Sequence, residues 1–359
     1  MAKIAFDTFW DVVRESGLEA RPMAECPEDW DRVLEASDYA PVSHTRTMIG
    51  YQLSYVAHQS APCMDASLVV YHEKRPVAVW PLSLRRLASG WELGSNEGAV
   101  LPPLFIAGIG GRMRKSLLGG ILGFVEQLCR RYGIPEWRGV ESFGGEAGAT
   151  LWHCRQMEAG AQTHPTHELY VDLSQDLAEI KANLRRSYKS LLTSGLKLWS
   201  VNRLYREGGA TFEEFRELHQ HVAGRVTRHS DTWAEQEKAV REGAAFLIFL
   251  RDNAEKMVGG GLFHVSPHEG LYAVGAYDRA LFDKPLGHLV QMRAIEEMKA
   301  MGLRWYKIGE RLYPRDVPAP SQKELSIAHF KEGFATHVFF KLHTVTKCRQ
   351  PASEGSQGQ

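Results

Sequence analysis

Two carboxylates and a tyrosine stand at the ends of apolar, strand-like runs, where they are suited to proton transfer. Tyr277 and Asp278 close the run GLYAVGAYD, and Glu310 closes the run RWYKIGE. Carboxylates and phenols serve as general acids and bases, and α/β proteins tend to place such groups at strand ends. The alternative is that both carboxylates form ion pairs with neighbouring basic residues, namely Arg279, Lys307 and Arg311.

A second group of side chains lies in the segment GRVTRHSDTW at 224–233. Arg225 and Arg228 can clamp a phosphate by bidentate contacts, and Trp233 can stack on a sugar ring. The alternative is that Trp233 fills the core while Thr232 caps a helix and both arginines face solvent. We expect a substrate-binding role, because the arginines fall in a loop between two predicted helices.

Basic residues recur along an amphipathic stretch that predicts a helix over 176–194. Arg185 and Lys189 are four residues apart and would share one face, which suits the phosphates of a donor or an acceptor. A solvated surface is the alternative for such a run of charge. The basic residues of the stretch and its end are Lys181, Arg185, Arg186, Lys189 and Lys197.

Two loops lead into predicted helices, and a helix N-terminus suits an anion because its backbone N–H groups and dipole point outward. Lys284, Gly287 and His288 stand at the start of a helix predicted over 286–301. The glycine-rich loop 106–116 precedes a helix predicted over 117–132. Neither loop has the P-loop or Rossmann glycine spacing, so flexible surface turns are the alternative. His288 can also act as a base or simply pack.

The remaining pattern predicts an α/β protein of two halves, each with a mixed, largely antiparallel sheet flanked by helices. Segments 115–141 and 284–310 share the order loop, helix, glycine, strand, which indicates a duplication. Capping-box patterns, Thr211 with Glu214 and Thr232 with Glu235, predict two helix starts. Further helices are expected at 5–16, 27–37, 45–59, 212–223 and 232–242, and strands at 66–72, 75–85, 91–95, 137–141, 166–173, 244–251, 256–265, 270–277 and 304–309.

These elements predict an N-terminal lobe over 1–160 and a C-terminal lobe over 161–349 that carries most of the site residues. The tail 350–359 is poor in apolar residues and is expected to be disordered. The chain holds 43 Lys and Arg against 43 Asp and Glu, so it lacks the basic excess of a DNA-binding protein.

Five scattered cysteines without a C-x-x-C pair argue against a disulfide framework and a zinc site, and no metal is expected. The N-terminus has no signal-peptide pattern, and no apolar run is long enough to cross a bilayer. We therefore expect a cytoplasmic protein, and peripheral contact with a lipid-linked substrate remains open.

Three stretches resemble the Fem-type and related duplicated GNAT acyltransferases. The run YVDLSQDLAEIKANLRRSYKSLLTSGLK at 170–197 is similar to their central signature, in which a strand ending in Asp-Leu-Ser leads into a basic helix. The segment 270–310 resembles their C-terminal lobe, and HFKEGFATHVFF at 329–340 resembles their Phe-Lys-x-Gly-Phe element. Lys331 lies in that element and is a candidate for contacting the donor, or else an exposed helix lysine.

The resemblance implies two GNAT-like lobes and acyl transfer to an amine. Under it, Tyr277, Asp278 and Glu310 are the catalytic candidates; Arg225, Arg228, Trp233, Arg185 and Lys189 are the substrate-binding candidates; and Lys284, Gly287, His288 and Lys331 are the donor-binding candidates. The expected donor is acyl-CoA, and the expected acceptor is an amino sugar or glycan precursor of the cell envelope.

Two other functions stay open. The loop 279–287 reads RALFDKPLG and lacks the glycine-rich pyrophosphate loop of acetyltransferases, which keeps aminoacyl-tRNA as an alternative donor. The balanced charge and the absence of the helical arm of some Fem enzymes favour CoA instead. A non-catalytic protein that binds glycans or nucleotide sugars is the alternative from another class.

Overall fold

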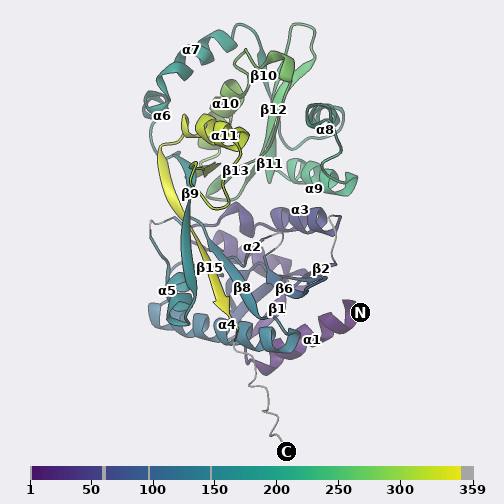
Figure 1. Cartoon of the computed structure of the whole chain (residues 1–359), viewed down its shortest axis with the longest axis vertical. Helices are drawn as coiled ribbons and strands as arrows, with labels where there is room; N and C mark the ends of the chain where they lie inside the picture. The colour runs from purple at the N-terminus through teal and green to yellow at the C-terminus, as the bar shows by residue number, and fades with distance from the viewer. Residues whose placement is uncertain (1, 59–61, 96–97, 146–147, 349–359) are drawn as a thin grey trace, which may run out of the picture. The chain divides into compact units, whose positions relative to one another are not determined.

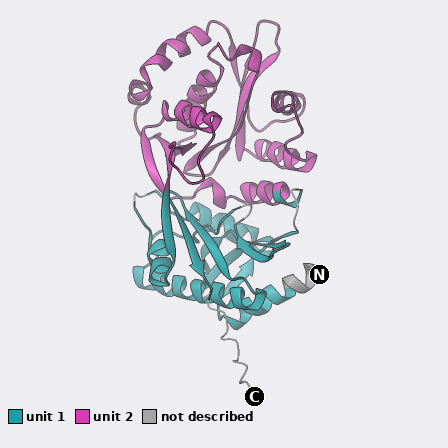
Figure 2. Ribbon diagram, viewed as in Figure 1, with its two compact units in different colours: residues 1–38, 56–165, 341–359 teal, residues 39–55, 166–340 magenta. Residues whose placement is uncertain are grey.

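The computed structural model describes residues 2–58, 62–95, 98–145 and 148–348 and divides them between two compact units (Figures 1 and 2). Unit 1 comprises 1–38, 56–165 and 341–359, and unit 2 comprises 39–55 and 166–340. The chain therefore enters each unit more than once, which differs from the linear division at 160 expected from the sequence. The predicted disordered tail lies outside the described residues.

Unit 1 is an α/β unit built around a core of apolar side chains from α1, α4 and the strands between them. One sheet has the strand order β1-β3-β4-β7 and a second has the order β2-β5-β6. The C-terminal half of β15 pairs antiparallel with β8. The elements are α1 (Ala2–Glu15), β1 (Ala20–Pro22), η1 (Met23–Glu25), α2 (Pro27–Glu35), β2 (Cys63–Asp65), β3 (Leu68–His72), β4 (Arg75–Trp80), β5 (Ser83–Leu87), β6 (Gly90–Gly94), β7 (Leu104–Phe105), α4 (Gly111–Tyr132), β8 (Glu136–Glu141) and α5 (Leu151–Glu158).

Unit 2 is built on a sheet with the order β10-β11-β12-β13-β14-β9-β15, in which β13 and β14 are parallel. Helices α8 and α9 cover one face, and α6, α7 and α10 cover the other (Figure 1). The elements are η2 (Val42–His44), α3 (Arg46–Ala57), β9 (Gln162–Asp172), α6 (Leu177–Asn183), α7 (Arg186–Gly195), β10 (Ser200–Leu204), α8 (Ala210–Ala223), α9 (Ser230–Arg241), β11 (Ala245–Arg251), β12 (Met257–Val265), β13 (Glu269–Tyr277), η3 (Arg279–Leu281), α10 (Leu286–Ala300), β14 (Trp305–Arg311), α11 (Gln322–Glu332) and β15 (His337–Lys347).

The duplicated helix–glycine–strand order is present in both units. Helix α4 ends at Gly133, whose φ is +64°, and β8 follows. Helix α10 is followed by Gly302, with φ +80°, and then by β14. A glycine adopts the left-handed conformation that ends a helix without steric cost. The glycine after each helix therefore predicts where that helix ends and the next strand follows. No described helix combines the length and the apolar character needed to cross a membrane.

Three local predictions were wrong. The expected single helix over 176–194 is two helices, with a break at Leu184 and Arg185, because the backbone N–H of Arg185 donates to Gly333 O at 2.9 Å. Helix α4 begins at Gly111, inside the segment expected to be a loop. Helices α8 and α9 begin at Ala210 and Ser230 and not at the predicted capping boxes. Among the described helices, capping boxes form at Asp176 with Glu179 and at Ser321 with Glu324.

A buried carboxylate explains why residues 39–55 belong to unit 2. Glu269 is 3% exposed and accepts hydrogen bonds from the Tyr39 hydroxyl at 2.5 Å and from the Val42 N–H at 3.0 Å. Burial raises the pKa of Glu269, and the cation of Lys307 opposes that rise. Lys307 Nζ also lies 2.6 Å from Glu168 Oε1, whose side chain is 1% exposed. One lysine thus serves two interior carboxylates.

We expect Lys307→Met to lower the free energy of unfolding by about 3–5 kcal/mol, because it leaves buried carboxylates without their cation. Urea denaturation at neutral pH measures the loss. Lys256→Met is the matched control, since Lys256 is 67% exposed and only 3.8 Å from Asp278; its effect should stay within about 0.5 kcal/mol. Equal losses in the two variants would contradict a central role for Lys307.

Candidate functional site

The parallel strands β13 and β14 pair over only three residues and then diverge. Their register runs from Glu269↔Trp305 to Leu271↔Lys307. Beyond that point β13 continues against β12 as far as Tyr277, and β14 continues against β9 as far as Arg311. The side chains between the diverging strands define the candidate site, which we call the divergence site. It consists of Tyr272, Tyr277, Gly287, Glu310 and Lys331.

A bulge in β13 brings Tyr272 and Tyr277 to the same face of the sheet. The register with β12 shifts between Leu262↔Val274 and Phe263↔Tyr272, so Ala273 is an extra residue. An odd separation of five would otherwise place the tyrosines on opposite faces. Their hydroxyls lie 3.2 Å apart. Gly275 makes room for the pair, because a Cβ there would lie 1.9 Å from the Tyr272 hydroxyl.

Burial keeps these phenols protonated. It raises the pKa of Tyr272 and of Tyr277, in the second case together with the neighbouring Tyr272. The buried Tyr306 on β14 donates to Gln291 Oε1 on α10, and burial raises its pKa as well. At neutral pH the tyrosines are therefore hydrogen-bond donors, so Tyr277 is suited to stabilising negative charge and not to removing a proton.

Lys331 reaches the same place from the end of α11. Its Nζ lies 5.3 Å from the centroid of the Tyr272 ring, a cation–π geometry. Burial lowers the pKa of Lys331, and the carboxylate of Glu310 opposes the shift. Gly309 has φ +149°, and a Cβ there would lie 2.4 Å from Lys331 Nζ. The β14 register skips Ile308, so this strand is bulged too.

The N-terminus of α10 lies against the tyrosines. A Cβ on Gly287 would meet Phe330 at 3.0 Å and Tyr277 at 3.6 Å. His288 packs edge-on against Tyr188, with ring centroids 4.5 Å apart, and against Phe330 at 5.1 Å. Burial lowers the pKa of His288 to about 4, helped by Arg185. His288 is thus neutral at pH 7 and lacks the charge expected of an anion-binding side chain.

Asp278 and Lys284, two of the predicted site residues, make local structural contacts. Asp278 caps the η3 turn by accepting a hydrogen bond from the Ala280 N–H at 3.0 Å. Lys284 is exposed and lies 2.8 Å from Asp283 Oδ2. Two carboxylates were proposed for proton transfer. Glu310 lies near enough to Lys331 to act on its pKa, whereas Asp278 caps the η3 turn. Arg311, expected as a partner for Glu310, is bound to Glu332 at 2.7 Å.

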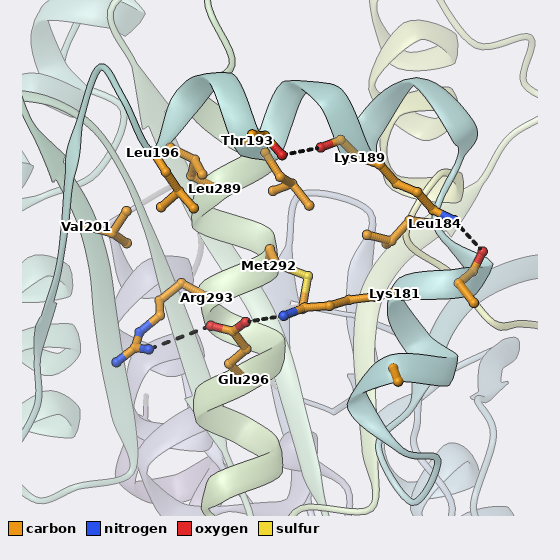
Figure 3. A pocket seen from close by; sticks show the side chains of 13 residues that line it. Lys181, Leu184, Lys189, Thr193, Leu196, Val201, Leu289, Met292, Arg293 and Glu296 are labelled. Atoms are coloured by element: carbon orange, nitrogen blue, oxygen red, sulfur yellow. Dashed lines mark hydrogen bonds and ion pairs between the residues drawn. The ribbon is translucent and has the colours of Figure 1, made fainter.

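The structure separates Arg185 from Lys189, which were expected to share one helix face. Arg185 precedes α7 and donates to His329 O at 2.8 Å and to the Tyr188 hydroxyl at 3.1 Å. These contacts bind the start of α7 to the end of α11. Lys189 instead lines a pocket between α6, α7 and α10 and donates to Ala182 O at 3.3 Å (Figure 3).

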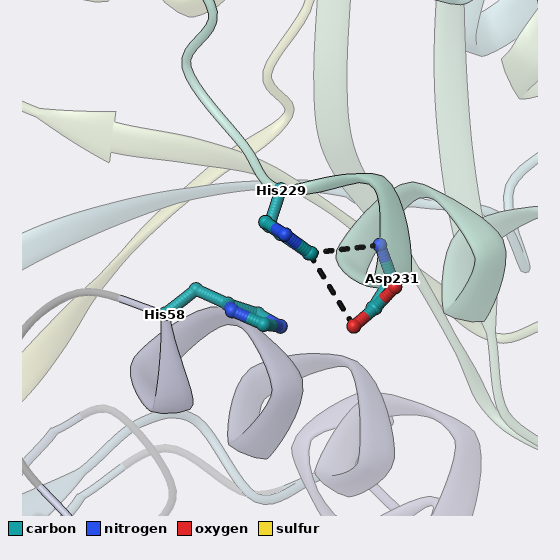
Figure 4. Close-up of side chains that lie close together, drawn as sticks. All are labelled: His58, His229 and Asp231. Atoms are coloured by element: carbon teal, nitrogen blue, oxygen red, sulfur yellow. Dashed lines mark hydrogen bonds and ion pairs between the residues drawn. The ribbon is translucent and has the colours of Figure 1, made fainter.

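Arg228 lies in a cluster on the opposite sheet face, with α3, α8 and α9. Its guanidinium is 3.3 Å from the Tyr51 hydroxyl and 3.3 Å from His219 Nε2. It also lies over the ring of Trp233, at 5.5 Å. Arg225 is exposed in the same loop. The loop ends at His229, whose ring accepts a hydrogen bond from the Asp231 N–H and so caps α9 (Figure 4).

Trp233 is 2% exposed and packs against Phe212, Phe215 and His219. This position corrects the expectation of a ring that stacks on a sugar, because the core already covers it. Thr232 is fully buried and lies 3.3 Å from the Ser54 hydroxyl.

The Arg228 cluster holds buried polar atoms without hydrogen-bond partners among the described residues. They are Trp233 Nε1, Gln236 Oε1 and Nε2, His219 Nδ1 and both ring nitrogens of His264. Burial lowers the pKa of His264 to about 4, and burial with Arg228 lowers that of His219 to about 4. Sequence reasoning missed His264, because a lone histidine in an apolar strand carries no motif. It also missed Tyr272 on β13 and Gln291 on α10, because neither belongs to a recognisable sequence motif.

Comparisons in sequence identify no relative: no known family model matches the chain, and no curated protein is significantly similar. Solved structures do match. FemX aligns with a TM-score of 0.68 at 12% identity, over 91% of this chain and 97% of FemX. L-PGS from Bacillus licheniformis aligns with a TM-score of 0.57 at 12% identity, over 90% and 93% of the two chains.

A third match is the C-terminal domain of a putative lysylphosphatidylglycerol synthetase from Agrobacterium fabrum, with a TM-score of 0.51 at 12% identity, over 89% and 92% of the two chains. Identities this low show the fold alone. The chain therefore has the Fem-type, duplicated GNAT-like fold, which confirms at the level of fold the resemblance seen in its sequence.

We expect Gly275→Ala to lower the free energy of unfolding by about 1–3 kcal/mol, because the new methyl displaces the Tyr272 side chain. Gly120→Ala is the control: Gly120 lies inside α4 with open space around its Cα. That substitution should raise stability by about 0.5–1 kcal/mol. Chemical denaturation measures both. A neutral Gly275 variant would show that the tyrosine pair is loosely held.

We expect the stability of the protein to fall as pH drops from 6.5 toward 4. Between these values the unfolded chain protonates its histidines, whereas the folded chain keeps His264 neutral because its pKa is about 4. His264→Leu should flatten the slope by up to about 1.4 kcal/mol per pH unit. Parallel curves for the parent and His264→Leu would contradict the assignment. Urea unfolding at several pH values supplies the data.

Proposed function

We propose that the protein transfers an acyl group from acyl-CoA to an amine of a cell-envelope glycan precursor or a nucleotide-linked amino sugar. The observation that carries the proposal is the divergence site, where two protonated tyrosines, a half-buried lysine and an uncapped helix start meet in a Fem-type fold. Such groups favour a reaction in which negative charge develops on an acyl oxygen and on a leaving group.

The reaction requires three roles from the protein: a base for the amine, hydrogen-bond donors for the departing atom, and a positive charge near the acyl oxygen. The amine nitrogen forms a bond to the acyl carbon, while the bond from that carbon to the donor's sulfur or oxygen breaks. The attacking ammonium group must first lose a proton, and the exposed carboxylate of Glu310 is the acceptor we assign to it. The departing atom carries negative charge until it takes a proton from water, and the hydroxyls of Tyr272 and Tyr277, which burial keeps protonated, are the hydrogen-bond donors we assign to that charge.

Lys331 supplies the positive charge. It lies against Gly309 and the Tyr272 ring and is partly shielded from water, so its attraction for a carbonyl oxygen or a phosphate is stronger than at an exposed position. Pro285 precedes α10 and has no polar side chain to cap it, so the positive end of that helix dipole favours the same charge.

The loop 279–287 supports a second candidate donor. Asp278 closes the η3 turn and Lys284 pairs with Asp283, so the loop forms a tight turn in place of a glycine-rich phosphate cradle. Aminoacyl-tRNA as donor is therefore the alternative. A glycan- or nucleotide-sugar-binding protein without turnover is the remaining candidate.

The test is an incubation of the protein with a panel of acyl-CoAs, and separately with aminoacyl-tRNA, in the presence of amino-sugar nucleotides, followed by mass spectrometry of the acceptors. We expect an acyl-CoA to increase the acceptor mass. Lys331→Met should lower kcat/KM by about 100-fold, as removal of a group that stabilises an oxyanion does. Lys323→Met is the control, because Lys323 is exposed on the same helix α11.

Each outcome separates the candidates. Transfer from aminoacyl-tRNA alone would replace the first proposal with the second. Unchanged acceptor mass with both donors would favour the binding protein. Equal activity of the Lys331 and Lys323 variants would overturn the assignment of the divergence site.

A further inference from the structure

Unit 2 contains a pocket of about 820 Å³ that does not include the residues of the divergence site. It lies between α6, α7, α10 and the strand β10 (Figure 3). This volume is in the range of pockets that bind small molecules. The lining residues are Ala178, Lys181, Ala182, Leu184, Lys189, Leu192, Thr193, Leu196, Val201, Leu289, Met292, Arg293 and Glu296.

One side of the pocket is apolar. Leu196, which follows α7, lies beside Leu289 of α10 in the close-up view, and Val201 of β10 lines the same part of the pocket (Figure 3). Leu196 is 65% exposed, which is unusual for a leucine beside other apolar side chains. Together with Leu192 and Met292 these residues form an apolar surface. An alkyl chain bound there would bury this surface from water, which is energetically favourable.

The other side of the pocket is basic. Lys181 Nζ lies 3.0 Å from Glu296 Oε1, and Arg293 Nη1 lies 3.6 Å from Glu296 Oε2. Lys189 donates to the Ala182 carbonyl at 3.3 Å and has no carboxylate within ion-pair distance among the described residues. Lys181 and Arg293 pair with Glu296, and Arg293 also lies 2.5 Å from Glu297 Oε1, so Lys189 is the lining cation best placed to take an added anion.

We propose that this pocket binds a single-chain fatty carboxylate, with its alkyl chain along the leucines and its carboxylate at Lys189. Charge complementarity selects an anionic head group, and the adjacent apolar side selects a chain. The residues involved differ from those of the proposed acyl-transfer site, so this binding and the proposed reaction can fail independently.

The test is a fluorescence titration of the full chain with dansyl-labelled undecanoic acid, followed by displacement with unlabelled ligands. Dodecanoate should displace the probe. Octanoate should compete at least about tenfold less well, because each buried methylene contributes roughly a factor of four in affinity. The cationic dodecyltrimethylammonium should be at least about tenfold weaker than dodecanoate, because it meets like charge at Lys189.

Matched variants locate the site. Lys189→Glu and Leu196→Glu should each weaken probe binding by about tenfold. The controls Lys197→Glu and Leu198→Glu change exposed neighbours outside the lining and should bind as the parent does.

The comparison of head groups uses the unaltered protein and therefore holds even if a variant folds poorly. Equal competition by the anionic and cationic amphiphiles would overturn the proposal. The proposal would also be overturned if the protein bound phosphatidylglycerol vesicles but dodecanoate did not displace the probe. That result would indicate binding to a membrane surface and not to a single chain in the pocket.

Discussion

The divergence of β13 from β14 is the constraint on which the organisation of unit 2 depends. A parallel pair that separates after three residues leaves the facing edges of both strands unpaired with each other, so each strand must be held by its outer neighbour, β12 or β9. Both strands also carry a bulge close to the separation. A bulge bends a strand and increases its twist, which is how the sheet accommodates the separation while keeping its outer pairings.

The bulges also decide which side chains meet. Tyr272 and Tyr277 reach one face because Ala273 is inserted between them. Two glycines, Gly275 and Gly309, then leave the volume that the Tyr272 hydroxyl and the Lys331 chain occupy. Gly275 is needed because of a tyrosine three residues away on the same strand, and Gly309 because of a lysine from α11.

Burial, and not the type of side chain alone, sets the protonation states in unit 2. The tyrosines of the divergence site have raised pKa values and remain O–H donors, whereas His288 and His264 have a pKa of about 4 and remain neutral. Lys331 and Lys307 are the cations that reach into this interior, and each lies beside groups of opposite charge or an aromatic face. The acidic and basic residues of the neighbouring loop, such as Asp278 and Lys284, cap a turn or form local ion pairs.

The sequence by itself determined the local elements and the Fem-type resemblance. Helical periodicity, glycine stops and apolar strand runs depend on neighbours a few residues away, so α10, Gly302 and β14 were predictable. Only the tertiary structure decided which chemical groups meet. The break before α7 depends on Gly333, the tyrosine pair on a bulge, and the place of Lys331 on Gly309. Side-chain alternation changes with one inserted residue, and partners far apart in the chain leave no periodic signal, so these contacts could not be read from local pattern.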